Sequence, residues 1–251
     1  MRVLSMNVNG IRAVSKKGFF TQSFEPVDFL CLQEARCDEL HLPLLPSFTP
    51  YACPAIKKGY SGVAIYSKKT PALIQKGFGV REFDEEGRYL ELVFDNFILI
   101  SLYAPSGSSS ALRQAAKFRF LDAFFAHLQD LRKRGQEILI CGDWNIAHTE
   151  KDLKNWRQNQ NYSGFLPEER AWLSRVFDEL GYVDVFRMLN QEPHQYTWWS
   201  NRGNAYANNV GWRIDYQVAT PMLAKSAKEA MIHKEPRYSD HAPLVIDYDW
   251  R

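Results

Sequence analysis

Residues 89–103 read YLELVFDNFILISLY, two apolar runs separated by the pair Asp95-Asn96. Each run is rich in β-branched or aromatic residues and has the length of a strand. Asp and Asn tolerate the positive φ angles of tight turns, so this stretch predicts a β-hairpin. In residues 112–134, which follow, apolar side chains recur every three or four positions, and Gly135 suits a helix end. A hairpin followed by a long helix indicates a fold that mixes sheets with helices.

Similar apolar runs occur on both sides of the hairpin. They are residues 3–7, 29–34, 62–67, 138–141, 196–200, 212–219 and 244–248. A second helix is predicted from Pro167, with Glu168 and Glu169 in its first turn and Gly181 after its last turn. Strands therefore outnumber helices. β-Sheets with helices packed on their outer faces account for this better than a strictly alternating βαβ fold.

Length and composition limit the class of protein. A chain of 251 residues with 45% hydrophobic residues can bury a large core, which excludes a disordered or collagen-like polymer. The sequence contains neither a linker-like stretch nor a fixed-period repeat, so we expect one domain over residues 1–251. A net charge of +2 is too small to identify a nucleic-acid partner. Without a signal-peptide core or a membrane-length apolar segment, the sequence predicts a soluble, cytoplasmic protein that does not bind membranes.

Four cysteines are present, at Cys31, Cys37, Cys53 and Cys141, and none forms a CxxC pair. Cys31 and Cys141 lie within apolar, strand-like runs. We therefore expect reduced thiols that serve packing, and the pattern argues against a zinc site.

Carboxylates and carboxamides repeatedly stand where an apolar run ends or begins. They are Asn7, Asn9, Glu34, Asp143, Asn145, Asp215 and the Asp240-His241 pair. A single acid after a strand is usually a turn residue or a helix cap. Recurrence at several strand ends is harder to explain by turns, because strands that end on one rim bring such side chains together. Hard oxygen ligands suit Mg²⁺, whose other positions are filled by water and substrate phosphate, so the pattern predicts phosphate chemistry.

Five blocks of the sequence carry a resemblance to a known family. They are MNVNGIR (6–12), LQE (32–34), GDWNIAH (142–148), GWRIDY (211–216) and SDHAP (239–243). In this order they resemble the exonuclease III family of abasic-site endonucleases and exodeoxyribonucleases, within the endonuclease/exonuclease/phosphatase superfamily. The WRID block and SGFLPEER (163–170) are similar to its DNA-repair branch. The resemblance implies an α/β fold, a four-layer sandwich of two packed mixed β-sheets flanked by helices.

The resemblance also implies a metal site and a nucleophile site. Glu34 would be the principal ligand of Mg²⁺, with Asn7 and Asp240 near the metal, and Mn²⁺ can substitute for Mg²⁺. Asp143 would align or deprotonate the attacking water. Asn145 would help to orient that water and the phosphate.

Three more residues would act on the phosphate itself. By the same resemblance, Tyr103 would donate a hydrogen bond to a phosphoryl oxygen or assist the leaving group. His241, held by Asp215, would stabilise the negative charge that develops on the phosphate. Phosphodiester hydrolysis requires this combination of charge neutralisation, an aligned nucleophile and leaving-group assistance.

Substrate recognition is predicted from two further groups of residues. Trp198, Trp212 and Ile214 match family positions that form an apolar pocket for the abasic sugar. The alternative is that they fill the core, which strand alternation favours for one member of the Trp198-Trp199 pair. Candidate DNA contacts near the motifs are Arg36, Lys57, Arg157 and Asn159, and a solvated polar face is the alternative reading of these positions.

The implied function is a Mg²⁺-dependent DNA-repair phosphodiesterase that acts at abasic sites or removes 3′-blocking groups and 3′ nucleotides. Its expected partner is double-stranded DNA with abasic sites or 3′-damaged ends, and a monomer is expected. One alternative is a catalytically idle nucleic-acid or protein-binding regulator on the same fold, against which the presence of Glu34, Asp143 and His241 argues. Another is a phosphodiesterase for lipids or small phosphate esters, which would not specially require Trp198 and Trp212.

Overall fold

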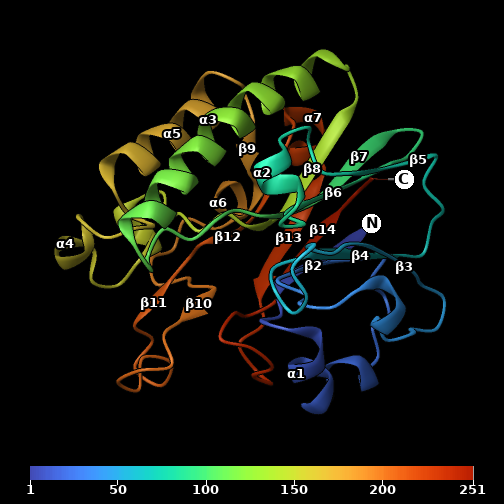
Figure 1. Cartoon of the computed structure of the whole chain (residues 1–251), viewed down its shortest axis with the longest axis horizontal. Helices are drawn as coiled ribbons and strands as arrows, with labels where there is room; N and C mark the ends of the chain where they lie inside the picture. The colour runs from blue at the N-terminus through green and yellow to red at the C-terminus, as the bar shows by residue number, and fades with distance from the viewer. Residues whose placement is uncertain (251) are drawn as a thin grey trace.

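The computed structural model describes residues 1–250 and contains, over that range, two six-stranded sheets packed face to face (Figure 1). The first sheet has the order β13 (Ala227–Ile232), β14 (Leu244–Tyr248), β1 (Arg2–Asn7), β2 (Phe29–Gln33), β4 (Val63–Ser67) and β3 (Thr49–Cys53). The second has the order β5 (Leu73–Lys76), β6 (Tyr89–Val93), β7 (Phe97–Tyr103), β8 (Glu137–Asp143), β12 (Asp215–Ala219) and β9 (Val183–Asp184). Both sheets are mixed, because β1 pairs in parallel with β2 and β7 with β8, whereas their other neighbours are antiparallel.

Strand alternation sends one set of side chains between the sheets and the other set outward. In β1, Val3 packs in the layer between the sheets, while Leu4 and Met6 pack in the cluster that includes α1 (Ile11–Lys16). A hydrogen bond of 3.0 Å from Gln33 Nε2 to Ser101 Oγ crosses between the sheets. Burial on both faces explains why the central strands read as continuous apolar runs.

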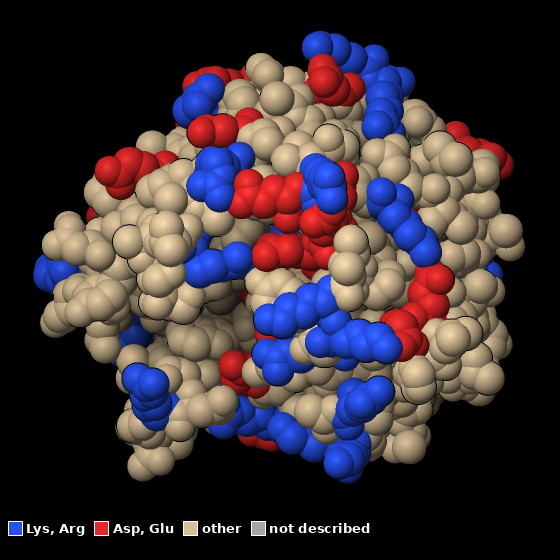
Figure 2. Space-filling view, viewed as in Figure 1, with Lys and Arg blue, Asp and Glu red and all other residues tan. Residues whose placement is uncertain are grey.

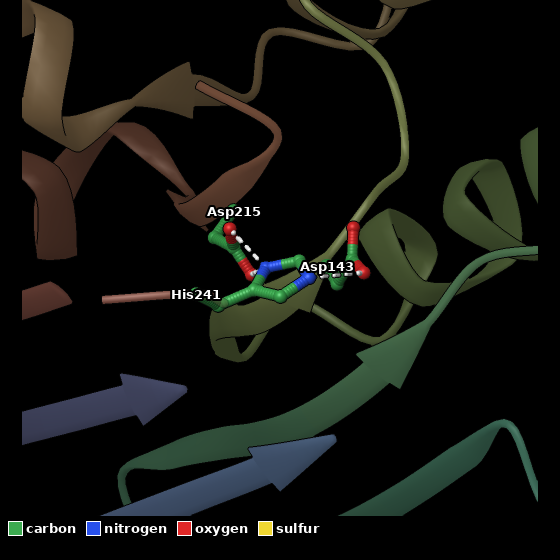
Figure 3. Close-up of side chains that lie close together, drawn as sticks. All are labelled: Asp143, Asp215 and His241. Atoms are coloured by element: carbon green, nitrogen blue, oxygen red, sulfur yellow. Dashed lines mark hydrogen bonds and ion pairs between the residues drawn. The ribbon is translucent and has the colours of Figure 1, made fainter. Parts of the chain in front are cut away.

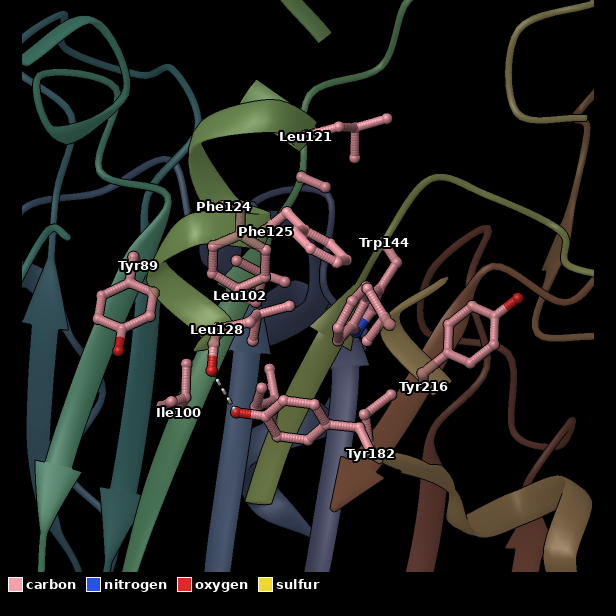
Figure 4. Packing of buried hydrophobic residues seen from close by; sticks show 14 of the residues in the cluster. Tyr89, Ile100, Leu102, Leu121, Phe124, Phe125, Leu128, Trp144, Tyr182 and Tyr216 are labelled. Atoms are coloured by element: carbon pink, nitrogen blue, oxygen red, sulfur yellow. Dashed lines mark hydrogen bonds between the residues drawn. The ribbon is translucent and has the colours of Figure 1, made fainter. Parts of the chain in front are cut away.

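Helices α3 (Ala111–Lys133) and α5 (Pro167–Asp178) cover the outer face of the second sheet (Figure 1). Phe124 and Leu128 of α3 pack with Ile100 of β7 in one buried cluster (Figure 4). The shorter helical segments are α2 (Arg81–Asp84), α4 (Trp156–Asn159), α6 (Val185–Leu189), α7 (Pro221–Lys225), and the 3-10 turns η1 (Phe19–Thr21), η2 (Glu39–His41) and η3 (Glu150–Asp152). Within residues 1–250, no helix is both long enough and apolar enough to span a membrane.

The predicted sandwich of mixed sheets flanked by helices is confirmed, and so is the hairpin, in which Phe94 N donates to Phe97 O at 2.9 Å. The prediction of one strand over residues 212–219 was wrong. β11 (Gly211–Trp212) pairs with β10 (Trp198–Trp199), and β12 pairs with β8. The break lies between Trp212 and Asp215 and contains Arg213, whose buried guanidinium lies 2.7 Å from both Asp152 and Asp184. These acidic partners offset the cost of burying its charge.

Candidate active site

The two parallel strand pairs deliver four polar side chains to one rim. β1 ends at Asn7, β2 is followed directly by Glu34, β7 ends at Tyr103 and β8 ends at Asp143. Since the carboxyl ends of parallel strands meet at the same edge, each pair contributes two of these residues. Face-to-face packing of the sheets then brings Asn7 within 2.9 Å of Asp143.

The strand register of the second sheet places three candidate site residues side by side across neighbouring strands. Tyr103 pairs with Asp143 across β7 and β8, and Asp143 pairs with Asp215 across β8 and β12. Residues directly opposite each other on neighbouring strands project from the same face, so these three side chains are neighbours. Gly142 permits the close approach of β7 and β8, because a Cβ at this position would lie 2.0 Å from the carbonyl oxygen of Leu102.

A pocket of about 750 Å³ opens at this rim. Most of the residues proposed from the sequence line it: Asn7, Glu34, Tyr103, Asp143, Asn145, Asn159, Trp198, Trp212, Ile214, Asp240 and His241. Asp215 lies behind His241 and is fully buried.

The basic DNA-contact candidates lie outside this lining. Arg36 is exposed and forms an ion pair with Glu34. Lys57 lies over the ring of Tyr60, and Arg157 over the ring of Trp156. The structure therefore places Arg36 at the edge of the site and leaves the roles of Lys57 and Arg157 as predictions.

Asn7 connects the carboxylates of Glu34 and Asp143 by hydrogen bonds. Its amide nitrogen donates to Glu34 Oε2 at 3.1 Å and to Asp143 Oδ2 at 2.9 Å. The donor set of Glu34 and Asp143 is made of hard oxygens, and it lines a pocket with room for water and a phosphate. Such a set fits Mg²⁺, which is commonly held by one or two carboxylates with water in its other positions.

Asp215, His241 and Asp143 form a buried chain of titratable groups (Figure 3). His241 Nδ1 lies 2.9 Å from Asp215 Oδ2, and His241 Nε2 lies 3.9 Å from Asp143 Oδ2. Burial alone would lower the pKa of His241, but the charges of Asp215 and Asp143 outweigh it and raise this pKa to about 10. The imidazole is therefore held as a cation at neutral pH. Together the three side chains could hold a metal ion, although His241 Nδ1 is already engaged by Asp215.

The pKa values of the neighbouring Asp143 and Tyr103 are also shifted. Burial, followed by the charge of Asp215, raises the pKa of Asp143 to about 7, although His241 and Asn7 oppose the shift. A carboxyl group that titrates near neutrality suits a general base. Burial and the charges of Glu34 and Asp143 hold the pKa of Tyr103 well above its usual value, so Tyr103 remains a neutral phenol that donates a hydrogen bond.

One wall of the pocket is apolar. Trp198, Trp212 and Ile214 belong with Phe165 to a small cluster that is separate from the main cores, and the two indole rings meet edge to face at 6.4 Å. Trp199 is buried in a different cluster, as strand alternation requires. Of the two tryptophans in β10, Trp198 therefore faces the pocket and Trp199 fills the core.

Two polar residues without a predicted role, Thr197 and Asn9, connect this wall to the charged groups. Thr197 is fully buried, and its hydroxyl donates to Asp215 Oδ2 at 2.5 Å. Asn9 donates to Asp240 Oδ1 at 3.0 Å, and the Trp198 indole donates to Asp240 Oδ2 at 3.2 Å. These contacts fix the orientation of the Asp240 carboxylate at the pocket lining, and its place near a metal stays a prediction. The position of Asn9 after β1 was the available signal for it, whereas the contact of Thr197 depends on the tertiary structure.

Comparison with known proteins places this geometry among nucleases. The model of the endonuclease/exonuclease/phosphatase family matches residues 4–241. The exodeoxyribonuclease of Bacillus subtilis (strain 168) is 38% identical over 250 residues, which are 98% of each chain. The 3′ phosphatase NExo from Neisseria, solved bound to a product DNA hairpin, superposes with a TM-score of 0.90 at 25% identity over 100% of both chains. An AP endonuclease from Archaeoglobus fulgidus superposes with a TM-score of 0.87 at 26% identity, also over 100% of both chains.

Proposed function

Because this chain belongs to the endonuclease/exonuclease/phosphatase family, we propose that it is a DNA-repair nuclease that hydrolyses the DNA backbone at abasic sites and 3′ ends. The observation that carries the proposal is the meeting of the row Tyr103, Asp143 and Asp215 with His241 beside an apolar wall. A catalytically idle regulator would not need this complete set of groups in one pocket. We further propose that residues 1–251 act as a single domain and as a monomer.

The proposed cofactor is Mg²⁺, held by Glu34 with Asn7 and Asp240 near it, and Mn²⁺ can replace it because it takes the same oxygen ligands. When bound, the ion would neutralise negative charge on the scissile phosphate. Arg36 pairs with Glu34 and so occupies part of this carboxylate when no ion is present.

The side chains of the protein perform the remaining steps. Asp143 accepts a proton from the attacking water. The backbone N–H of Asn145 fixes the orientation of the Asp143 carboxylate by donating a hydrogen bond to Asp143 Oδ1 at 2.9 Å. The Asn145 carboxamide is anchored on Ala104 O at 2.9 Å and faces the same pocket. The His241 imidazolium stabilises charge on the phosphate, and Tyr103 donates a hydrogen bond to a phosphoryl oxygen or to the leaving oxygen. As water attacks, the bond from phosphorus to the leaving oxygen breaks, and this oxygen takes up a proton from solvent.

DNA binding is proposed for the surface around the pocket. Figure 2 shows a hollow near β10 and β11, with basic side chains along its margins and acidic side chains among them. We propose that Arg36, Lys57, Arg157 and Asn159 contribute contacts to the phosphates of double-stranded DNA. The free thiols of all four cysteines fit the reducing cytoplasm, which we propose as the site of action.

One assay tests the proposed function. Purified protein is incubated with duplexes that carry an abasic site, a 3′-phosphate or an undamaged recessed end, with Mg²⁺ or with excess chelator. We expect cleavage or phosphate release on at least one damaged duplex, abolished by the chelator and restored by Mg²⁺. Equal turnover in the chelator, or no turnover on any duplex, would refute the proposal.

The rate should depend on pH in a bell-shaped manner. Asp143 must be deprotonated to accept a proton, so the single-turnover rate should fall as pH drops below about 7, the pKa of Asp143. His241 must be protonated, so the rate should also fall as pH rises through about 10, the pKa of His241. Rates from about pH 5 to about pH 11 test both limbs. A flat profile below neutrality would contradict the role of Asp143 as a base.

Trp212→Ala should weaken discrimination between abasic and undamaged sites. An abasic sugar rotates out of the duplex at lower cost than a paired nucleotide and fits a narrow apolar pocket, so removing one wall admits the wrong substrate. We expect the ratio of the two cleavage rates to fall by about tenfold, in line with the effect of a few lost apolar contacts. Trp250→Ala, which truncates a tryptophan outside the pocket lining, is the control. An unchanged ratio in folded Trp212→Ala protein would remove the lesion pocket from the mechanism.

A further inference from the structure

A buried ion pair lies beneath the active-site loops and takes no part in the mechanism described above. Lys117 of α3 and Glu169 of α5 are both 0% exposed, and Lys117 Nζ lies 2.7 Å from Glu169 Oε1. Removing two charges from water is costly, and apolar residues of similar volume are often at least as stabilising. Stability alone therefore does not explain this pair, and its other contacts indicate what it does.

Lys117 reaches the segment that carries the proposed general base. Its Nζ donates to the carbonyl oxygen of Asn145 at 2.7 Å. Asn145 has a left-handed backbone with φ of 54°, and its N–H holds Asp143. Burial lowers the pKa of Lys117, whereas the charges of Glu169 and Asp143 act in the opposite direction. The ammonium group thus fixes the turn that orients the Asp143 carboxylate.

Glu169 holds the neighbouring wall of the pocket. Its Oε2 accepts hydrogen bonds from Gly164 N at 2.6 Å and Leu166 N at 3.1 Å, and Gly164 O accepts one from Ala147 N at 2.7 Å. Gly164 has φ of 94°, and a Cβ there would lie 3.3 Å from the indole of Trp212. One carboxylate therefore fixes the backbone on which the Trp212 side of the pocket rests.

We propose that Lys117 and Glu169 are positioning residues, whose pairing sets the distance between the Asp143–Asn145 turn and the wall beside Trp212. A sugar seated against this wall then presents its phosphate to Asp143. The inference rests on the proposed function, because it assigns a further part of the same site. Asp143 and Asn145 act on the transition state, so loss of the pair should lower kcat and leave KM nearly unchanged.

The test uses the double variant Lys117→Met/Glu169→Gln, because either single change leaves an unpaired buried charge that threatens folding. The matched control is Glu91→Gln, since Glu91 is also 0% exposed and pairs with Arg134 just beyond the opposite end of α3. Steady-state kcat and KM, together with single-turnover rates, are measured on an abasic duplex with Mg²⁺ well below each Tm. We expect about a 10- to 100-fold lower kcat in the double variant, as for a displacement of about 1 Å, with KM within about twofold.

Hydrogen exchange of residues 143–166 supplies a readout that is independent of activity. Exchange in this segment should be faster in the double variant than in the wild type or in Glu91→Gln. A wild-type kcat in the double variant, or an equal loss of kcat in Glu91→Gln, would overturn the positioning role. If the wild-type protein cleaves nothing, the proposed function fails, whereas unaltered exchange in the double variant separately rejects the ion pair as the element that fixes these loops.

Discussion

Replacing Asp143 by asparagine is expected to lower the single-turnover rate of abasic-site cleavage by about 10³-fold, within the range that general base catalysis supplies. Asparagine keeps the size of the side chain and can still accept the hydrogen bond from the Asn145 amide, which is 2.9 Å long in the wild type. It cannot accept a proton from water. DNA affinity should stay within about threefold, because Asp143 is not one of the proposed contacts to the DNA phosphates.

Rapid-quench cleavage and equilibrium binding on the same duplex separate these two effects. Asp130→Asn serves as the control, since Asp130 is an exposed residue of α3 whose carboxylate pairs with Lys133. A cleavage rate near that of the wild type in Asp143→Asn would show that another group handles the attacking water.

Glu34→Gln should raise the Mg²⁺ concentration needed for half-maximal activity by at least about tenfold and lower the rate at ordinary Mg²⁺ by about 10²-fold, because a charged oxygen ligand is lost. The change nearly preserves size, and Glu34 is partly exposed, so folding should survive. A Mg²⁺ titration of the single-turnover rate gives both quantities.

Arg36→Gln is the matched control for this experiment, because it breaks the same ion pair and keeps the carboxylate. We expect Arg36→Gln to need no more Mg²⁺ than the wild type, since Arg36 competes for the oxygens of Glu34. If Glu34→Gln and Arg36→Gln shifted the titration equally, the ion pair rather than metal ligation would be responsible.

The central strands and the long helix could be predicted because their sequence patterns are local. β1, β2, β7 and β8 are buried along nearly their whole lengths and read as apolar runs. β5 and β13 lie at sheet edges with several exposed residues, so their patterns are weak, and they were not predicted. The arrangement of the two sheets came from the family resemblance, because pairing between distant strands leaves no periodic signal in one sequence.

The site residues likewise divide into those that local sequence patterns predict and those that only the structure reveals. Glu34, Asp143 and Asp215 were found because each stands directly at the end or start of an apolar run. Lys117 was missed although it offered a signal, since it lies on the same helical face as Leu121 and Phe124 and is a charge among apolar residues. Its partner Glu169 lies 52 positions further along the chain, so only the structure reveals the contact.

The most direct measurement of the central claim is cleavage of an abasic duplex in H₂¹⁸O with Mg²⁺, with both fragments analysed by mass spectrometry. Hydrolysis of the phosphodiester bond leaves a hydroxyl group on one fragment and a phosphate with one ¹⁸O atom from water on the other. We expect this pair of products from the wild type and at most trace amounts from Asp143→Asn. An unsaturated sugar at the break with no ¹⁸O in the phosphate would show elimination instead of hydrolysis and would contradict a water nucleophile activated at Asp143.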